Sequence, residues 1–397
     1  MARRRVVVVG AGIGGLTAGV ALHRRGWDVT VCEQAAEPPV TGAGIGLAPN
    51  ALRALLAVDV DVTRVTGSAV PDTMGVRRAD GRWLTRTATA DMAARYGRAP
   101  IAVPRPALTV ALAAALPTGA LRYGTAVSAV EESGGRPVVR TAAGGELPAD
   151  LVVAADGIHS PLRRAYFPAH PGLRYLGETA WRALVEAPDL SVRDMSETWG
   201  RGERFGVTPL TDGRFYLYAT ATVPADTRSE DPRAELRRRF GAWHDPIPAL
   251  LDRVDRLDVA DVLRHDLHEL AAPLPRLHHG RIAWLGDAAH AMAPNLGQGG
   301  CQAVEDAVIL AHLLPAGESG DGPDGVPEAL AAYTAARRDR TDAVRVRARR
   351  VGRLGTVRHP LVVAVRDLVL RATPARLALR GMDDLFDGFR LPDRPVK

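Results

Sequence analysis

The sequence predicts an α/β fold, in which a parallel sheet built on a βαβ unit is combined with a separate antiparallel sheet and C-terminal helices. The βαβ unit starts with the apolar strand Val6–Val9, continues through helical periodicity over 13–25, and ends in a strand over 27–32. Its connection is expected to be right-handed, so the two strands are parallel. Residues 173–225 are rich in short alternating strands, which favours an antiparallel sheet, and residues 327–353 have the periodicity of a long helix.

Local turn signals predict the remaining elements. Asp80-Gly81 and Asp212-Gly213 are turn sequences, and each lies between two alternating segments, which indicates two hairpins. Further strands are expected at 121–130, 137–141, 151–154 and 281–285, further helices at 50–56, 107–116 and 299–314, and glycine-rich or surface loops at 41–46 and 315–327.

Composition limits the possible classes of protein. The chain has 397 residues, 46% of them hydrophobic, and a formal net charge of +6, with Lys397 as its only lysine. The arginines are mostly interspersed with acidic residues, so we expect no nucleic-acid partner. Two cysteines, Cys32 and Cys301, are too few for a disulfide framework or a metal cluster. We therefore expect no metal and a cytoplasmic location.

The N-terminus resembles a signal peptide, because Arg3–Arg5 precede an apolar stretch over Val6–Leu22. Five glycines interrupt this stretch, no small-residue cleavage site follows, and the pattern continues directly into another strand. We therefore assign it to the βαβ unit and expect no integral membrane association.

A glycine pattern occupies the turn after the first strand. The turn contains Gly10, Gly12, Ile13, Gly14 and Gly15 in the order G-x-G-x-x-G. Glycines permit a tight turn and a close approach of backbone N–H groups to a pyrophosphate, and the helix that follows faces the phosphates with its N-terminus. Glu33 ends the second strand, where a carboxylate accepts hydrogen bonds from free ribose hydroxyls and repels a 2′-phosphate. The unit therefore predicts a Rossmann-type site for FAD or NAD.

Two further strand ends carry an aspartate next to a glycine. Asp287 follows Gly286 and is a candidate to bind a ribityl hydroxyl, to cap the turn that follows it, or to do both. Residues 294–300, which include Pro294, Gly297, Gly299 and Gly300, lead into a helix whose positive end could face an electron-rich ring. Asp156-Gly157, within Asp156-Gly-Ile-His-Ser-x-x-Arg163, suits a turn beside a ligand, although an ordinary turn explains it equally well.

Together these motifs resemble the class A flavoprotein monooxygenases, the para-hydroxybenzoate and salicylate hydroxylase group. Their order and spacing match that family over roughly residues 5–350. The resemblance implies three parts: an FAD-binding domain (1–72, 98–170 and 277–330), interleaved with an antiparallel-sheet substrate domain (73–97 and 171–276), and a C-terminal helical segment (331–397). It also implies that Arg105 lies over the FAD phosphates and that Gly46 and Val127 approach the cofactor. Gln34 departs from the pattern, because many relatives carry a basic residue there.

The resemblance further implies a two-stage reaction. NADH or NADPH reduces FAD, and the reduced flavin captures O₂ as a C4a-hydroperoxide that transfers one oxygen to an electron-rich ring. The protein orients the substrate and excludes water, so we assign no protein nucleophile. His290 and His159 are more readily explained as hydrogen-bonded structural residues than as bases.

Substrate contacts are expected from the antiparallel sheet. The candidates are Trp181, Arg182, Arg204 and Tyr216, in a segment that is similar to the urate and salicylate hydroxylase branch. Arginines near the ring favour an anionic or carbonyl-bearing substrate, although exposed sheet arginines are equally common. A phenolic acid, a purine, a polyketide and a tetracycline-like polycycle all remain open, as do the choice of NADH or NADPH, the position of oxygenation and the oligomeric state.

Two other functions are compatible with the same scaffold. The first is an FAD-dependent dehydrogenase or reductase; a halogenase is disfavoured, since the tryptophan pair that precedes Ile-Pro in those enzymes is absent. The second is a non-catalytic flavoprotein-like carrier that binds a lipid or protein partner. An intact Asp287 and Gly297–Gly300 region favours a working flavin site over such a carrier.

Overall fold

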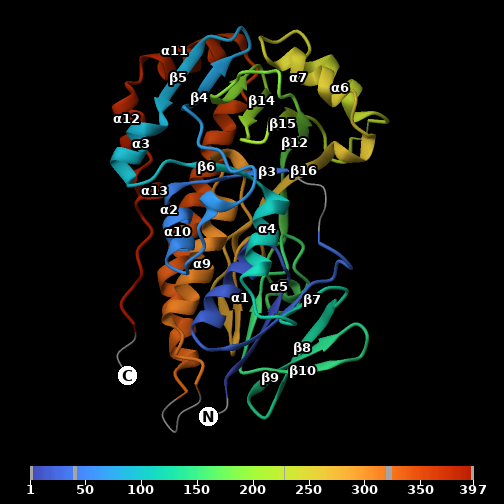
Figure 1. Cartoon of the computed structure of the whole chain (residues 1–397), viewed down its shortest axis with the longest axis vertical. Helices are drawn as coiled ribbons and strands as arrows, with labels where there is room; N and C mark the ends of the chain where they lie inside the picture. Colours follow the sequence, from blue (N-terminus) through green and yellow to red (C-terminus); the bar gives the residue numbers. More distant parts are fainter. Residues whose placement is uncertain (1–2, 39–42, 228, 319–323, 395–397) are drawn as a thin grey trace.

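The computed structural model describes residues 3–38, 43–227, 229–318 and 324–394, which form a mixed α/β fold with parallel and antiparallel sheets (Figure 1). The first sheet has six strands in the order β17-β18-β11-β1-β2-β7, all parallel except β17. Its strands are β17 (His278–His279), β18 (Ile282–Trp284), β11 (Leu151–Ala154), β1 (Arg5–Val9), β2 (Asp28–Cys32) and β7 (Leu121–Arg122). The predicted parallel βαβ unit is confirmed by β1, α1 (Ile13–Arg24) and β2.

The core of this sheet explains why its strands consist of apolar runs. Val6–Val9, Leu151–Ala154 and Ile282–Trp284 are buried throughout, because helices cover the sheet. On one side α1 packs against α9 (Gly299–Leu313), and α9 packs against α10 (Val326–Gly355). The helices predicted at 13–25, 299–314 and 327–353 are thus confirmed to within two residues at each end.

The second sheet has seven strands in the order β16-β12-β15-β14-β13-β4-β5, and lies in the upper part of Figure 1. Neighbouring strands are antiparallel except β13 and β4. The strands are β16 (Leu263–Leu270), β12 (Leu173–Glu186), β15 (Arg214–Thr222), β14 (Glu203–Pro209), β13 (Met195–Trp199), β4 (Thr73–Arg78) and β5 (Trp83–Ala88). Both predicted hairpins are confirmed, as β4–β5 and β14–β15.

One face of this sheet has its own hydrophobic core. Side chains such as Trp181, Phe205 and Leu217 pack there against α6 (Pro232–Phe240) and α7 (Ile247–Val254). The opposite face carries arginine, glutamate and tyrosine side chains and is turned towards the first sheet.

The remaining strands form two smaller sheets. A three-stranded sheet contains β8 (Val127–Ser133), β9 (Arg136–Thr141) and β10 (Glu146–Pro148), and a two-stranded sheet contains β3 (Gly44–Leu47) and β6 (Ile101–Pro104). The single strand expected at 121–130 was wrong, because the chain leaves the first sheet after β7, turns at Gly124 (φ +62°) and enters β8 in another sheet. Within the loop expected at 41–46, positions 41 and 42 lie outside the described residues, and Gly44 begins β3.

The remaining helices are α2 (Pro49–Leu56), α3 (Thr89–Tyr96), α4 (Arg105–Ala114), α5 (Pro161–Tyr166), α8 (Asp287–His290), α11 (Pro360–Ala372), α12 (Ala375–Arg380) and α13 (Asp383–Phe386). None of the helices that the structure describes is both long and apolar enough to cross a bilayer.

Candidate functional site

Two glycines in the turn after β1 are packed so closely that no side chain would fit on them. A Cβ on Gly10, whose φ is +102°, would lie 2.4 Å from the carbonyl oxygen of Ala155, and a Cβ on Gly15 would lie 2.0 Å from that of Gly10. A Cβ on Gly12 would instead meet nothing within 4 Å. Gly12 is also the N-cap residue of α1, and no side chain accepts a hydrogen bond from the first N–H groups of this helix there. This is the geometry that a pyrophosphate needs.

Glu33 lies beside this turn at the end of β2. One oxygen of its carboxylate accepts a hydrogen bond from the N–H of Ala11 at 2.8 Å, and the other accepts one from the N–H of Ala35 at 2.9 Å. Each carboxylate oxygen keeps a lone pair for a further donor, such as a ribose hydroxyl. Val127 is half-buried at the start of β8, and Thr125 just before it donates its N–H to the carbonyl of Glu33.

Three motifs that are far apart in the sequence meet at one edge of the six-stranded sheet. Val9 of β1 is paired with Ala154 of β11, and Ala154 is paired with Trp284 of β18, all in parallel. The residues that follow these strands therefore leave the sheet at the same carboxyl edge, which is where ligands bind in open α/β sheets. The Gly10 turn, Asp156 and Asp287 are thus parts of one site.

Asp156 provides a test of whether this edge fits a bound ligand. Its Oδ2 accepts a hydrogen bond from the N–H of Leu162 at 3.3 Å, whereas its Oδ1 is buried and has no partner among the described residues. Burial raises the pKa of Asp156. A buried carboxylate oxygen without a donor is costly, and a hydroxyl or N–H group of a cofactor would satisfy it. The residues present therefore fit FAD.

The loop after β18 and the neighbouring strand β3 present mainly backbone atoms at this edge. Asp287 is exposed, and a Cβ on Gly299 would lie 3.8 Å from its Oδ1. Pro294 and Gly297 are exposed, and Gly297 has φ +61°. Gly46 is exposed in β3, where a Cβ would meet nothing within 4 Å, so here too the wall of the site is main chain.

Arg163 links the loop that follows β11 to the loop that follows β18. The sequence motif did not predict this role. Its side chain is buried, and it donates to the carbonyl of Ala288 at 3.0 Å and to that of Ile158 at 2.5 Å. The N–H of Arg163 also donates to the hydroxyl of Ser160, which caps α5. The Ser-x-x-Arg spacing after Asp156-Gly157 was a visible signal, but Ala288, its partner in the other loop, lies 125 residues downstream.

A buried polar network on α9 supports the same edge, and the sequence did not indicate it. Asp306 accepts hydrogen bonds from the N–H of Gly286 at 3.0 Å, from Nε2 of His290 at 2.5 Å and from Nε of Arg337 at 2.6 Å. Burial alone would raise the pKa of Asp306, but His290 and Arg337 hold it well below its usual range. The structural role predicted for His290 agrees with this geometry.

The network continues along α9 towards the N-terminus of this helix. Glu305 accepts from Nη1 of Arg337 at 2.5 Å and from Nδ2 of Asn50 at 2.7 Å, and Asn50 donates to Oε1 of Gln298 at 3.0 Å. Gln298 is the N-cap residue of α9. Three polar residues inside an otherwise apolar helix, Gln302, Glu305 and Asp306, were the signal that could have revealed this network.

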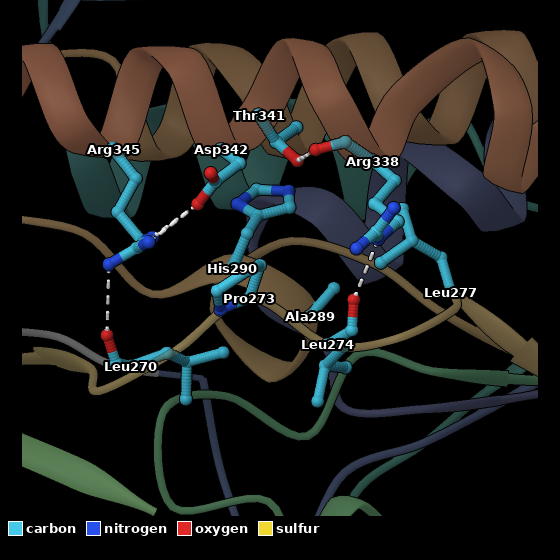
Figure 2. A pocket seen from close by; sticks show the side chains of 10 residues that line it. All are labelled: Leu270, Pro273, Leu274, Leu277, Ala289, His290, Arg338, Thr341, Asp342 and Arg345. Atoms are coloured by element: carbon cyan, nitrogen blue, oxygen red, sulfur yellow. Dashed lines mark hydrogen bonds and ion pairs between the residues drawn. The ribbon is translucent and has the colours of Figure 1, made fainter. Parts of the chain in front are cut away.

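Figure 2 shows the side of His290 that faces α10. A pocket between α10 and residues 270–277 is lined by His290, whose Nδ1 is buried without a partner among the described residues. Arg338 donates to the carbonyl of Leu274 at 3.0 Å, and Arg345 donates to Asp342 and to the carbonyl of Leu270. These bonds fix α10 behind the Gly286–His290 turn.

One face of the seven-stranded sheet is covered by α6 and α7, and we call the other the open face. The open face carries three of the four expected substrate contacts. In the register of β12, β14 and β15, Arg182 is paired with Tyr218 and Arg204 with Thr220, and Tyr216 lies two residues before Tyr218 on the same face. Trp181 precedes Arg182 and therefore points to the opposite face, where it is 3% exposed in the core under α6 and α7. The structure thus separates Trp181 from the other three, so we leave Trp181 out of the proposed substrate site.

Arg204 connects this face to the first sheet. It is buried and donates from Nη1 to Oδ1 of Asn295 at 2.6 Å and from Nη2 to Glu178 at 2.5 Å. Asn295 lies in the 3₁₀ turn Pro294–Leu296, directly before Gly297. Glu197 lies beside Arg204 and also accepts from the hydroxyl of Tyr218 at 2.5 Å. No sequence pattern indicated Asn295, Glu197 or Tyr218, because their roles depend on which strands are neighbours.

Tyr216 is a second point of contact, between the seven-stranded sheet and β3. Its ring occupies the place that a Cβ on Gly44 would need, 2.6 Å away, so Tyr216 packs directly on β3. Burial raises the pKa of Tyr216, which the positive charges of Arg182 and Arg105 oppose. Burial likewise lowers the pKa of His265, and the same two arginines lower it further. Arg105 is exposed at the start of α4, so two arginines, Arg182 and Arg105, lie near Tyr216.

Comparisons with known proteins identify the family to which the chain belongs. The family described as FAD binding domain matches residues 3–348. The chain is 36% identical to the aurachin C monooxygenase/isomerase of Stigmatella aurantiaca over 92% of this chain and 93% of that protein. It is 32% identical to the FAD-dependent urate hydroxylase of Klebsiella pneumoniae over 87% of this chain and 89% of that protein. The structure of Klebsiella pneumoniae HpxO complexed with FAD and uric acid has a TM-score of 0.88 and 30% identity, and covers 98% of each chain. The chain therefore belongs to the FAD-dependent aromatic monooxygenases, enzymes with FAD as cofactor and NAD(P)H as reductant.

Proposed function

We propose that this enzyme hydroxylates a planar aromatic or polycyclic small molecule held between the open face of the seven-stranded sheet and the carboxyl edge of the six-stranded sheet. The observation that carries the proposal is the hydrogen bond between Arg204 and Asn295, because it joins the two surfaces directly beside Gly297. Relatives that are named for aurachin C and urate support an aromatic substrate. Arg182, Tyr216 and the exposed Arg105 favour a substrate with an anionic or carbonyl oxygen.

The cofactor is proposed to lie along the carboxyl edge of the first sheet. The residues proposed to hold it are Gly10, Gly12, Ile13, Gly14, Gly15, Glu33, Gly46, Arg105, Val127, Asp156, Asp287, Pro294, Gly297, Gly299 and Gly300. Bound FAD would supply the redox chemistry, in which two electrons from NADH or NADPH activate O₂, so that one oxygen atom enters the ring and the other leaves as water. The protein supplies N–H groups for the pyrophosphate, carboxylates for hydroxyls, and a main-chain wall that brings the cofactor close to the substrate.

The division into domains follows from the same proposal. Residues 1–72, 98–170 and 277–330 would form a Rossmann-type FAD-binding domain, and 73–97 and 171–276 a substrate domain, because the two large sheets draw their strands from these ranges. The C-terminal segment 331–397 begins inside α10, so this boundary falls within a helix. A cytoplasmic location is proposed because both cysteines are free and buried and the reductant is a cytoplasmic metabolite.

A product screen with the FAD-loaded enzyme tests the proposal. Candidate phenolic acids, purines, quinolones and polycycles are incubated with NADH or NADPH under ¹⁸O₂, and products are analysed by mass spectrometry. We expect one ring substrate to gain a single labelled oxygen in proportion to the NAD(P)H consumed. Oxidation of NAD(P)H with a reduced or dehydrogenated product, and no label, would instead support a reductase.

Removing the functional groups of Tyr216 and Arg182 is expected to impair substrate binding specifically. In Tyr216→Phe and Arg182→Gln the KM for the identified substrate is expected to rise about tenfold, the loss of one hydrogen bond to a charged group, while FAD content stays unchanged. Arg264→Gln is the matched control, since Arg264 is paired with Trp181 and lies on the other face of the sheet. Equal KM effects in all three variants would contradict the placement of the substrate on the open face.

Asp287→Ala is expected to weaken FAD binding by about tenfold to a hundredfold, because an exposed carboxylate is removed from the end of β18 with little effect on packing. Flavin fluorescence titration of the apoprotein measures the affinity. Asp384→Ala on α13, which is also exposed, is the control and is expected to leave it unchanged. An unchanged FAD affinity in Asp287→Ala would favour the non-catalytic carrier.

A further inference from the structure

Helix α11 is oriented with two of its three charged residues, Arg366 and Asp367, turned inward. Arg366 is 6% exposed, and its guanidinium lies 5.2 Å from the ring centre of Trp199 and donates to the carbonyl of Leu354 at 3.2 Å. Asp367 is equally buried, and its carboxylate lies 3.7 Å from Nε of Arg78 on β4. Two adjacent charged residues thus fix the rotation of the helix on the edge of the seven-stranded sheet (Figure 1).

The opposite side of α11 is apolar and faces solvent. Its exposed side chains are Leu361 (72%), Val362 (50%), Val365 (61%), Leu368 (67%) and Val369 (58%). Their spacing i, i+1, i+4, i+7 and i+8 places them on one stripe of the helix. Leu377 of α12 is also exposed, at 58%. Such a contiguous stripe marks an interaction surface, since a helix that only had to pack on the protein would turn these residues inward.

The segment that contains this stripe is rich in arginine, and the nearest acidic residues in the sequence outside it are Asp342 and the pair Asp383-Asp384. Residues 343–382 contain ten arginines and a single acidic residue, the buried Asp367. The exposed arginines of this segment are Arg350, Arg353, Arg358, Arg371, Arg376 and Arg380. A second copy of the chain docked on the same stripe would bring two sets of arginines together, which is unfavourable. An anionic surface would instead complement them.

We infer that α11, together with the exposed arginines around it, docks this enzyme on an anionic lipid bilayer. An apolar stripe flanked by arginines is the pattern of a helix that lies in the plane of the membrane surface. The leucine and valine side chains enter the boundary between headgroups and acyl chains, and the arginines contact the lipid phosphates. With 13 residues, α11 is too short to span the hydrocarbon core. This surface is separate from the proposed site, and a failure of either inference leaves the other intact.

Vesicle sedimentation of the FAD-loaded full chain tests the inference. We expect the enzyme to sediment with vesicles of equal phosphatidylcholine and phosphatidylglycerol, to be released by high salt, and to remain in the supernatant with phosphatidylcholine alone. The triple variant L361S/V365S/L368S is expected to bind the anionic vesicles at least about tenfold more weakly. The variant R371Q/R376Q is expected to lose part of the binding and much of its salt dependence.

The control variant V70S/V110S removes two exposed valines outside this surface, which are 53% and 57% exposed, and is expected to sediment like the original enzyme. FAD absorbance and circular dichroism establish that each variant is folded. The inference is overturned if the original enzyme does not sediment with anionic vesicles, or if L361S/V365S/L368S binds them equally well. It is also overturned if size-exclusion chromatography shows a dimer that the triple variant dissociates, because a second copy then occupies the stripe.

Discussion

Asp306→Asn is expected to lower the free energy of unfolding by about 3–5 kcal/mol, since it leaves the guanidinium of Arg337 buried without one of its two carboxylates. The amide also replaces one carboxylate lone pair that accepts from Gly286 or His290, so the turn before Asp287 loses its support. FAD affinity is therefore expected to fall together with stability. Urea denaturation measures the first effect and flavin fluorescence titration the second.

The pH dependence of this variant provides an independent check. The pKa of Asp306 is held well below its usual range, so its stabilising effect is complete above the pKa of an unfolded aspartate, about 4. The effect is lost as pH falls through the folded pKa. The difference in stability between the original enzyme and Asp306→Asn is thus expected to shrink below about pH 4.

Asp339→Asn is the matched control for the same chemical change. Asp339 lies on α10 with its side chain 89% exposed and lies 3.4 Å from Nη1 of Arg338. Its replacement is expected to change the free energy of unfolding by less than about 0.5 kcal/mol. Similar losses in both variants would show that the buried network contributes no more than a surface ion pair.

Gly10→Ala is expected to lose stability, whereas Gly12→Ala is expected to lose mainly affinity for FAD. The added Cβ of Gly10→Ala would lie 2.4 Å from the carbonyl oxygen of Ala155 at a φ of +102°, so the turn must rearrange. A loss of about 3 kcal/mol or more of stability, with no retained flavin, is expected. Gly12 has φ −68° and open space around its Cβ position, so Gly12→Ala is expected to change stability by less than about 1 kcal/mol.

The affinity for FAD distinguishes the role of Gly12. Its open side is where we place the pyrophosphate, so the methyl group of Gly12→Ala is expected to weaken FAD binding about tenfold or more. Gly97→Ala is the control for affinity, since Gly97 lies at the end of α3, away from the proposed cofactor site; its φ of +77° strains an alanine, so this variant is expected to lose stability but to keep its FAD affinity. Unchanged FAD affinity in Gly12→Ala would rule out this turn as the phosphate site.

Elements with a strong local pattern were predicted to within one or two residues. The strand β1, the helix α1 and the turn between them are examples, because burial on both faces and the glycine turn leave clear local signals. The prediction of one strand over 121–130 was wrong, because its two halves have similar apolar character but pair with strands of different sheets. Pairing between distant strands cannot be inferred from local pattern.

The sheet face that we propose binds the substrate gives a second example, at the level of single residues. Trp181 and Arg182 are adjacent and both suit a substrate contact, but a strand alternates its side chains between two faces. Only the packing of α6 and α7 decides that Trp181 belongs to the core and Arg182 to the open face. The partners of Arg204 are likewise fixed by the register of β14 and by the position of Asn295.

By itself the sequence determined the βαβ unit, the glycine turn, Glu33 and the two aspartates at strand ends, and through their order it identified the family. These features depend on backbone conformation and on spacing along the chain, which a sequence records directly. Only the tertiary structure decided that Arg163 and Asp306 support the carboxyl edge of the six-stranded sheet, that Trp181 is core and that α11 turns its apolar side outward. Each of these depends on which surfaces come together in space, and that choice is made by the packing of the whole chain.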